Sequence, residues 1–407
     1  MKNRSLIQSG LIHAANLFTG VIVLILSVSA FGWATYGEIS LVLAITLLLT
    51  QISVLGNPGL MIASLSKLES SSYRKVVSGF TKRIIRPQIC VLLAIMLCIS
   101  FMLSTGTEQI SNISISALFA IGAGSLSAPI NKMLLLSLTL PGTYSKFVIL
   151  SLTKNFLIMA FLLTSLIVDS KIMILFCLAF AELALFPVLL LGIRKNMKNS
   201  STENTSFVEV NKRKDEISVF LITLYFELLA KYDFYLFSFF MNAKTFGLYA
   251  VISNVNESIQ TYLGVVRTQL SPYFTAHNSV SIKDPVFKLS LVKLIVTTLL
   301  LLGFCFTYFS FQIQGSNFPG WPLIYCLITA SSLAMFKSLV FGNVFIQRNK
   351  PLTLARIGVI HLGVLFLVTT TVFYWLGLVQ AIFSTIIINF LMSRRIVKNI
   401  PSSIKNL

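Results

Sequence analysis

Twelve apolar stretches fill the 407-residue chain from end to end, and hydrophobic residues make up 56% of it. About 20 apolar residues in a helix cross the ~30 Å hydrocarbon core of a bilayer. Backbone polar groups find no water in lipid, so each stretch must be helical. The predicted spans are residues 7–29, 38–60, 87–103, 113–138, 147–168, 172–193, 217–240, 246–274, 287–309, 321–346, 354–374 and 378–392. The sequence therefore predicts an all-α integral membrane protein of twelve transmembrane helices with no soluble domain.

Basic residues alternate between loops, and this alternation predicts the orientation of the chain. The positive-inside rule places loops rich in Lys and Arg in the cytoplasm. Such residues gather at positions 2–4, 67–86, 194–214, 348–350 and 394–405, whereas the loops at 31–37, 104–112 and 311–320 contain none. Both termini are therefore predicted to be cytoplasmic. Only Lys171 and Lys244 fall on the predicted outer side.

The formal net charge of +19 does not indicate nucleic-acid binding in this setting. Most of the charge lies in short cytoplasmic loops, where membrane topology and anionic lipid headgroups account for it. The expected partners are therefore membrane lipids, and no nucleic acid is expected.

Little in the sequence points to catalysis, to a metal or to a cofactor. The five cysteines lie scattered in apolar spans without a C-x-x-C pair, and we expect them to be core residues. His13 and His361 are either hydrogen-bonded structural histidines or proton carriers. The longest outer loops have about ten residues and no phosphate-binding or zinc motif occurs, so an enzyme is not expected.

A short repeat relates the two halves of the chain. Thr35-Tyr36-Gly37 precedes the second span, and Thr245-Phe246-Gly247 precedes the eighth, 210 positions later. Near the end of each span a polar residue is followed by a proline, as Asn57-Pro58 in the first half and Ser271-Pro272 in the second. We expect the glycine to allow a tight turn at the outer surface and the proline to loosen the helix end. The repeat predicts a parallel duplication of six plus six helices.

The duplication divides the chain into two pseudo-symmetric six-helix bundles. The predicted domains are an N-terminal bundle at residues 1–193, a polar cytoplasmic linker at 194–216 and a C-terminal bundle at 217–407. Two such bundles facing one another enclose a central cavity. Transporters built from repeats bind substrate at the interface between the repeats and alternate by rocking.

The seventh and eighth spans resemble those of a transporter family. The sequence Leu229-Ala230-Lys231-Tyr232-Asp233 is followed by Lys244-Thr245-Phe246-Gly247-Leu248-Tyr249-Ala250. An acidic residue deep in the seventh helix and a Gly-x-Tyr at the start of the eighth are similar to the Wzx-type flippases of O-antigen and related polysaccharides. These flippases share a superfamily with the multidrug extruders and the lipid II flippases.

The resemblance implies a function, a location and partners. It implies export of an undecaprenyl-pyrophosphate-linked oligosaccharide, the repeat unit of O-antigen or a related surface polysaccharide, across the bacterial inner membrane. It further implies cooperation with a polysaccharide polymerase and a chain-length regulator in lipopolysaccharide biosynthesis.

Basic side chains inside the spans form the candidate substrate site. Each costs roughly 2.5–3.5 kcal/mol at a helix centre, so such residues commonly line a cavity or pair with one another. Four of them lie toward the predicted cytoplasmic half: Lys132, Lys154, Arg267 and Lys337. We expect these cations to bind the pyrophosphate. For Lys132 and Lys154 the alternative is that their ammonium groups reach the membrane interface.

Acidic side chains inside the spans are candidates for a second role. Asp233 matches the acidic position of the flippase family, and Glu182 and Glu257 lie near mid-membrane. They are candidate counter-ions, or coupling sites for H⁺ or Na⁺. Glu227 and Lys231 are four residues apart and are expected to form a structural ion pair.

Two functions remain open at this point. The first is the flippase, acting by alternating access. The alternative is a cation-coupled antiporter of the multidrug-extruder kind. An extruder of cationic drugs is disfavoured by a cavity rich in Lys and Arg. A membrane-bound sugar polymerase is disfavoured by the short outer loops.

Overall fold

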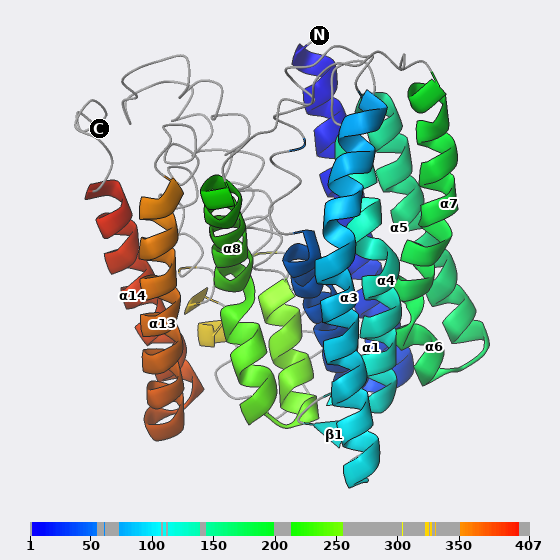
Figure 1. The fold of residues 1–407 in the computed structure, drawn as a ribbon. Helices are drawn as coiled ribbons and strands as arrows, with labels where there is room; N and C mark the ends of the chain where they lie inside the picture. The colour runs from blue at the N-terminus through cyan, green and yellow to red at the C-terminus, as the bar shows by residue number, and fades with distance from the viewer. Residues whose placement is uncertain are drawn as a thin grey trace. The chain divides into compact units, whose positions relative to one another are not determined.

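The computed structural model describes residues 2–54, 61, 73–106, 109–110, 113–138, 144–198, 213–254, 303, 322–324, 326–327, 330 and 351–398 (Figure 1). Several predicted features lie outside these residues. They are Glu257, Arg267, Lys337, the dipeptides Asn57-Pro58 and Ser271-Pro272, and most of the spans at 246–274, 287–309 and 321–346.

Long helices make up nearly all of the described chain. They are α1 Lys2–Val54, α3 Tyr73–Thr105, α4 Ile115–Ser137, α5 Tyr144–Ile167, α6 Lys171–Leu175, α7 Cys177–Lys198, α8 Arg213–Phe240, α13 Pro351–Leu376 and α14 Leu378–Lys398. Residues 243–254 are also helical. A small antiparallel pair, β1 Gln109–Ile110 and β2 Ile113–Ser114, joins α3 to α4. Five of the described helices are long and apolar enough to cross a membrane, which confirms a multi-pass all-α membrane fold.

The chain forms two compact units. Unit 1 comprises Met1–Leu224 and Ser238–Gly247, and unit 2 comprises Tyr225–Phe237 and Leu248–Leu407. In unit 1, α4 packs against α1, α3 and α7, and α5 packs against α1 and α7. In unit 2, α13 packs against α14. The predicted division at a linker of residues 194–216 stays a prediction.

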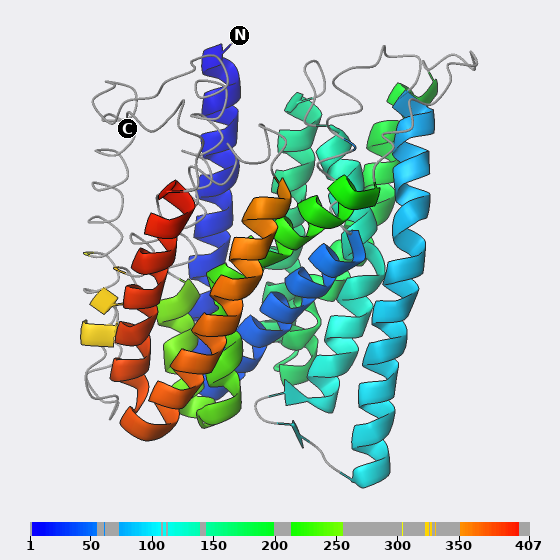
Figure 2. The same cartoon turned by 60° about the vertical axis from the view of Figure 1, so that its left-hand side comes forward.

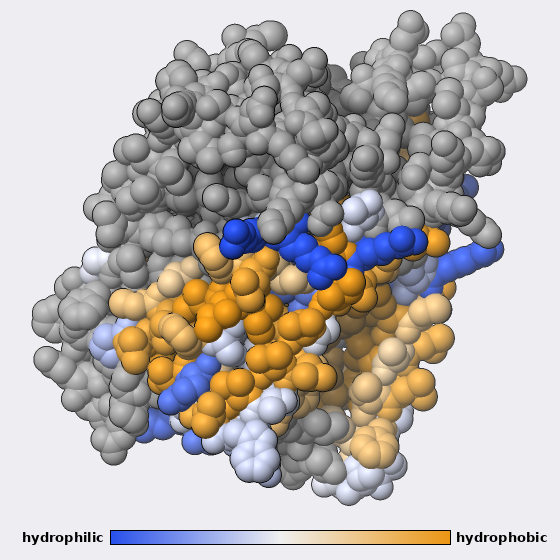
Figure 3. Space-filling model, turned by 90° about the vertical axis from the view of Figure 1, so that its left-hand side faces the viewer, coloured by the Kyte–Doolittle hydropathy of each residue, from blue (hydrophilic) through white to orange (hydrophobic). Residues whose placement is uncertain are grey.

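The surface of α13 and α14 has the polarity of a membrane-facing pair. Figure 3 shows a broad apolar surface on this side, with hydrophilic side chains along its border. Exposed Arg356, Arg394 and Arg395 lie near the ends of the two helices that are predicted to be cytoplasmic. Exposed Tyr374 and Trp375 lie at the opposite end of α13, where aromatic side chains commonly occupy the membrane interface.

One prediction about the first outer turn was wrong. The sequence suggested a loop at 31–37 with the tight turn at Gly37. The chain instead turns at Gly32, which has φ 80° and ψ 176°, and α1 resumes directly afterwards. The two segments of α1 diverge there (Figure 2). Only glycine adopts such a conformation without strain, so Gly32 makes the bend that was assigned to Gly37.

The repeated glycines have a different role, which is close backbone approach. A Cβ atom added at Gly37 would lie 2.9 Å from the Cα atom of Gly247. A Cβ atom added at Gly247 would lie 1.9 Å from the carbonyl oxygen of Trp33. Both glycines lie in unit 1, so the two members of the sequence repeat contact each other. Glycine is needed at this contact because any side chain would separate the two helix starts.

Replacement of Gly247 by Ala should therefore destabilise the protein. The new methyl group has no space beside Trp33, and overpacking of this kind typically costs roughly 1–3 kcal/mol. The thermal unfolding midpoint of purified protein in detergent should fall. Gly20→Ala is the matched control, because an added Cβ at Gly20 meets nothing within 4 Å. A Gly247→Ala midpoint equal to that of Gly20→Ala would contradict the close-contact role.

Candidate functional site

Unit 1 contains two separate apolar clusters with a polar layer between them. The first cluster includes Phe80, Met133 and Leu189, and the second includes Ile95 and Leu162. On each of five helices, a polar residue falls between members of the two clusters. These residues form what we call the polar layer: Thr46 and Thr50 on α1, Gln88 on α3, Asn131 on α4, Lys154 on α5 and Glu182 on α7.

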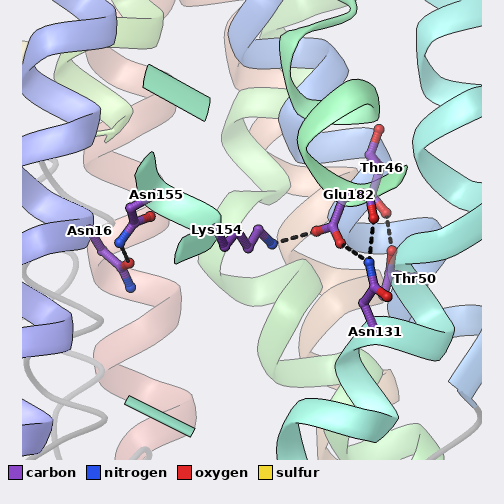
Figure 4. Close-up of polar contacts among 7 residues, drawn as sticks. All are labelled: Asn16, Thr46, Thr50, Asn131, Lys154, Asn155 and Glu182. Carbon is purple, nitrogen blue, oxygen red and sulfur yellow. Dashed lines mark hydrogen bonds and ion pairs between the residues drawn. The ribbon is translucent and has the colours of Figure 1, made fainter. Parts of the chain in front are cut away.

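Glu182 is the centre of the polar layer (Figure 4). Its residue is only 4% exposed. The ammonium group of Lys154 forms an ion pair with its Oε1. Asn131 Nδ2 donates to Oε2 at 2.8 Å and to the Glu182 carbonyl oxygen at 2.7 Å. A buried carboxylate is tolerated only when it is paired and hydrogen-bonded, so α4, α5 and α7 are held together by this one charge.

The polar layer retains unused hydrogen-bonding capacity. Thr50 Oγ1 donates to the carbonyl oxygen of Thr46 at 2.7 Å. Asn131 Oδ1 and Thr46 Oγ1 are buried and have no partner among the described residues. Buried polar atoms are normally bonded, so the Oδ1 atom of Asn131, whose Nδ2 group bonds Glu182, is suited to binding a small cation or a water molecule.

Gln88 compensates for a proline in the neighbouring helix. Pro129 lies inside α4 and has no N–H group, so the carbonyl oxygen of Ser125, four residues earlier, loses its helical partner. Gln88 Nε2 donates to this oxygen at 3.3 Å and also to the carbonyl oxygen of Leu126. In a membrane span an unsatisfied carbonyl would be costly, and α3 is thereby tied to α4.

A second buried carboxylate lies at the predicted outer end of unit 1. Glu38 accepts a bond at 3.0 Å from the backbone N–H of Ser114, which caps α4. Its other oxygen lies 3.2 Å from the Nζ atom of Lys171, at the start of α6. Lys171 was one of two exceptions to the charge asymmetry of the loops. The carboxylate of Glu38 provides a local reason for a lysine on that side.

Asp233 is buried in unit 2 and is bonded to the helix at residues 243–254. Tyr249 Oη donates to Asp233 Oδ2. The Nζ atom of Lys231 lies over the ring of Phe234, 5.6 Å from the ring centroid. The predicted ion pair between Glu227 and Lys231 stays a prediction.

His361 is fully buried in unit 2, at 0% exposure. Its Nδ1 lies 2.8 Å from Tyr225 Oη, and its Nε2 lies 3.0 Å from Asn389 Oδ1. Gly358 has no side chain, and the ring of Tyr225 occupies the space where one would lie. Both ring nitrogens are bonded and link α8, α13 and α14, so His361 matches the structural alternative. The side chain of His13 lies outside the described residues.

The structure rearranges the candidate residues into pairs. Lys154 and Glu182, predicted in separate roles, contact each other. Lys132 is half-buried on α4, and its predicted role stays a prediction, as do those of Glu257, Arg267 and Lys337. Sequence reasoning missed Glu38 and Asn131. Asn131 is next to Lys132 inside a span, so its uncommon polarity was a usable signal.

Comparisons with known proteins identify the fold. No family model and no curated protein matches the sequence. The MATE multidrug transporter DinF-BH matches with a TM-score of 0.62 at 10% identity, covering 97% of this chain and 94% of that chain. A MOP-superfamily transporter from Pyrococcus furiosus, whose binding pocket is described as having reverse polarity, matches with a TM-score of 0.57 at 10% identity over 96% and 95% of the two chains.

A third match is similar in extent. The outward-facing conformation of a MATE-family multidrug resistance transporter aligns with a TM-score of 0.55 and 11% identity, over 97% of this chain and 96% of that chain. At such low identities the likeness concerns the fold. The chain therefore has the fold of transporters of the multidrug/oligosaccharidyl-lipid/polysaccharide flippase superfamily.

Removing one partner of the Lys154–Glu182 pair should destabilise unit 1 more than removing both. A lone buried charge typically costs roughly 3–5 kcal/mol, whereas a neutral replacement of the whole pair costs much less. Lys154→Met and Glu182→Gln should each lower the unfolding midpoint in detergent, and the double variant should recover most of the loss.

The matched control for this cycle is Thr164→Val on the same helix. Thr164 is exposed, and among the described residues its hydroxyl bonds the carbonyl oxygen of Ala160 within α5. Strictly additive effects of the two single substitutions would show that the pair does not contribute to stability.

Proposed function

We propose that this protein is a flippase that moves an undecaprenyl-pyrophosphate-linked oligosaccharide from the cytoplasmic to the periplasmic leaflet by alternating access. The lipid tail would remain in the bilayer while the sugar and pyrophosphate cross. The proposal rests on how the acidic side chains of unit 1 are paired. Both acids in its described spans, Glu38 and Glu182, are paired with lysines.

This pairing bears on the sign of the substrate. A cationic drug is best held by a carboxylate that no protein cation neutralises. Among the described spans of unit 1, both carboxylates are already paired with lysines. The predicted cations Arg267 and Lys337 would extend the same polarity. An anionic pyrophosphate suits this balance better than a cation does.

Coupling to an ion is a separate part of the proposal. Two negative charges moving outward across an inside-negative membrane go downhill by roughly 2.3 kcal/mol per charge per 100 mV. The charged part of the substrate therefore needs no cation gradient. We assign Glu182 as the place where H⁺ or Na⁺ would compete with Lys154, because Asn131, which bonds Glu182, keeps an unpartnered Oδ1 atom among the described residues. Asp233, bonded by Tyr249, is the corresponding candidate in unit 2.

The second candidate function is a cation-coupled multidrug extruder. The solved structures with the same fold favour it over the flippase, because those named as MATE proteins are multidrug transporters. Under this alternative, Glu182 would release Lys154 when a drug or cation binds. The two candidates share alternating access and differ in substrate charge, so an experiment on substrate decides between them.

Deletion of the gene in its own host separates the two candidates. We expect loss of surface polysaccharide together with accumulation of single lipid-linked repeat units in the cytoplasmic leaflet. Wild-type protein should restore export, and Arg267→Ala and Lys337→Ala should restore it at least ten-fold less well. Surface polysaccharide and extracted lipid-linked sugars are the measurements. Thr164→Val serves as the control.

Other outcomes have distinct meanings. Unchanged polysaccharide with altered tolerance to cationic drugs would replace the flippase by the extruder. Full rescue by both variants would retain the flippase and remove Arg267 and Lys337 from its site. The inner-membrane location, the cytoplasmic termini, and cooperation with a polymerase and a chain-length regulator remain parts of the proposal.

A further inference from the structure

Two amide side chains meet at membrane depth on an accessible part of unit 1 (Figure 4). Asn155 on α5 donates from Nδ2 to Oδ1 of Asn16 on the first segment of α1, at 2.7 Å. Asn16 is exposed and Asn155 is half-buried. Sequence analysis did not select either residue, because neither is charged.

The depth of this amide pair is close to the middle of the bilayer. Asn155 lies 11 residues after Tyr144 and 12 before Ile167, the two ends of α5. At 1.5 Å per residue, this is roughly 17 Å from each end. Asn16 lies near the midpoint of the predicted span at 7–29. Neither amide can reach the aqueous interface as a long lysine side chain can.

An amide exposed at this depth does not suit contact with lipid chains. Burying an amide in an apolar medium without compensation costs roughly 2–7 kcal/mol. Polar residues at membrane depth therefore face the interior of the bundle or a path that holds water and substrate. Exposure and depth together favour a position on such a path over contact with lipid chains.

The amide pair uses only part of its hydrogen-bonding capacity. Each Asn side chain offers one carbonyl acceptor and one NH₂ donor group. The bond between them leaves the Asn16 Nδ2 group and the Asn155 Oδ1 atom with no partner among the described residues. One donor and one acceptor therefore stand side by side. Sugar hydroxyls are both donors and acceptors, and two neighbouring hydroxyls match this arrangement.

The neighbouring charge does not interfere with the amide pair. Lys154 precedes Asn155 in the chain, but its ammonium group is directed to Glu182 in the polar layer (Figure 4). The amide pair therefore presents neutral polar groups. Neutral donors and acceptors distinguish hydroxyl-bearing ligands from ligands that lack hydroxyls, because an unmatched polar group is penalised.

We propose that Asn16 and Asn155 form a subsite for the sugar hydroxyls of the transported lipid-linked oligosaccharide. The inference rests on the proposed flippase function. It assigns to unit 1 a contact with the sugar part of the substrate, separate from the cations expected to hold the pyrophosphate. The subsite acts on binding of the glycan and leaves the lipid and pyrophosphate contacts unchanged.

Binding measurements on purified full-length protein in detergent test the subsite. The probes are the lipid-linked oligosaccharide extracted from the deletion strain and undecaprenyl pyrophosphate without sugar. Asn16→Leu and Asn155→Leu keep similar volume and remove the hydrogen bonds. We expect each to weaken binding of the oligosaccharide at least five-fold and to leave binding of the sugar-free lipid unchanged. Thr153→Val on α5 is the matched control, because its hydroxyl bonds the carbonyl oxygen of Ile149 within the helix.

The outcomes separate this subsite from the flippase function itself. Unchanged oligosaccharide binding in both variants overturns the subsite while the flippase stands. An equal loss for both probes also overturns it, because the residues would then support structure or the pyrophosphate contact. If wild-type protein binds neither probe, the flippase proposal fails and the subsite fails with it. Unfolding midpoints equal to wild type show that the variants are folded.

Discussion

The carboxylate of Glu182 is the constraint on which the arrangement of unit 1 depends. A charge at this depth must be neutralised and hydrogen-bonded, or the helix that carries it cannot remain in the membrane. Lys154 and Asn131 meet that requirement from two other helices. The apolar clusters on either side of the polar layer stabilise unit 1 by burial. They do little to specify how the helices are arranged, because apolar packing tolerates many arrangements. The polar layer selects one arrangement.

Local defects in the helices are compensated by neighbouring side chains. Pro129 removes one backbone donor from α4, and Gln88 of α3 supplies another. Gly32 bends α1 where a side chain would strain the backbone. Gly37 and Gly247 allow two helix starts to touch. The proposed alternating access requires a bundle that changes shape, and we expect the change at such places.

The two proposals divide recognition between charge and neutral polarity. Pyrophosphate is expected to be held by Lys and Arg, which act over distance and tolerate different sugars. Sugar is expected to meet Asn16 and Asn155, whose hydrogen bonds require a matching geometry. A transporter that moves a large glycan benefits from this division, because charge provides affinity and a few amides provide selectivity. The fold is shared with multidrug transporters, so the architecture alone does not decide the substrate.

The fold class was predictable because it depends on properties that each segment carries alone. Length and hydropathy determine that a segment crosses the bilayer, and the described helices α4, α5, α13 and α14 lie within a few residues of their predicted spans. The predicted helix boundaries were wrong where a long-range contact or the backbone geometry of a single residue decides where a helix ends. The loop at 31–37 was replaced by a bend at Gly32, and the span beginning at Ile172 is interrupted between α6 and α7.

The sequence by itself determined that the chain is a multi-pass helical membrane protein, and it predicted which ionisable residues lie at membrane depth. Only the tertiary structure decided their partners. Lys154 and Glu182 are 28 residues apart, and Asn16 and Asn155 are 139 apart. The repeat of Gly37 in Gly247 was visible in the sequence, but its role in close contact was not. Hydropathy is a property of one segment, whereas a hydrogen bond or a steric contact depends on the distance between two segments, and packing alone determines that distance.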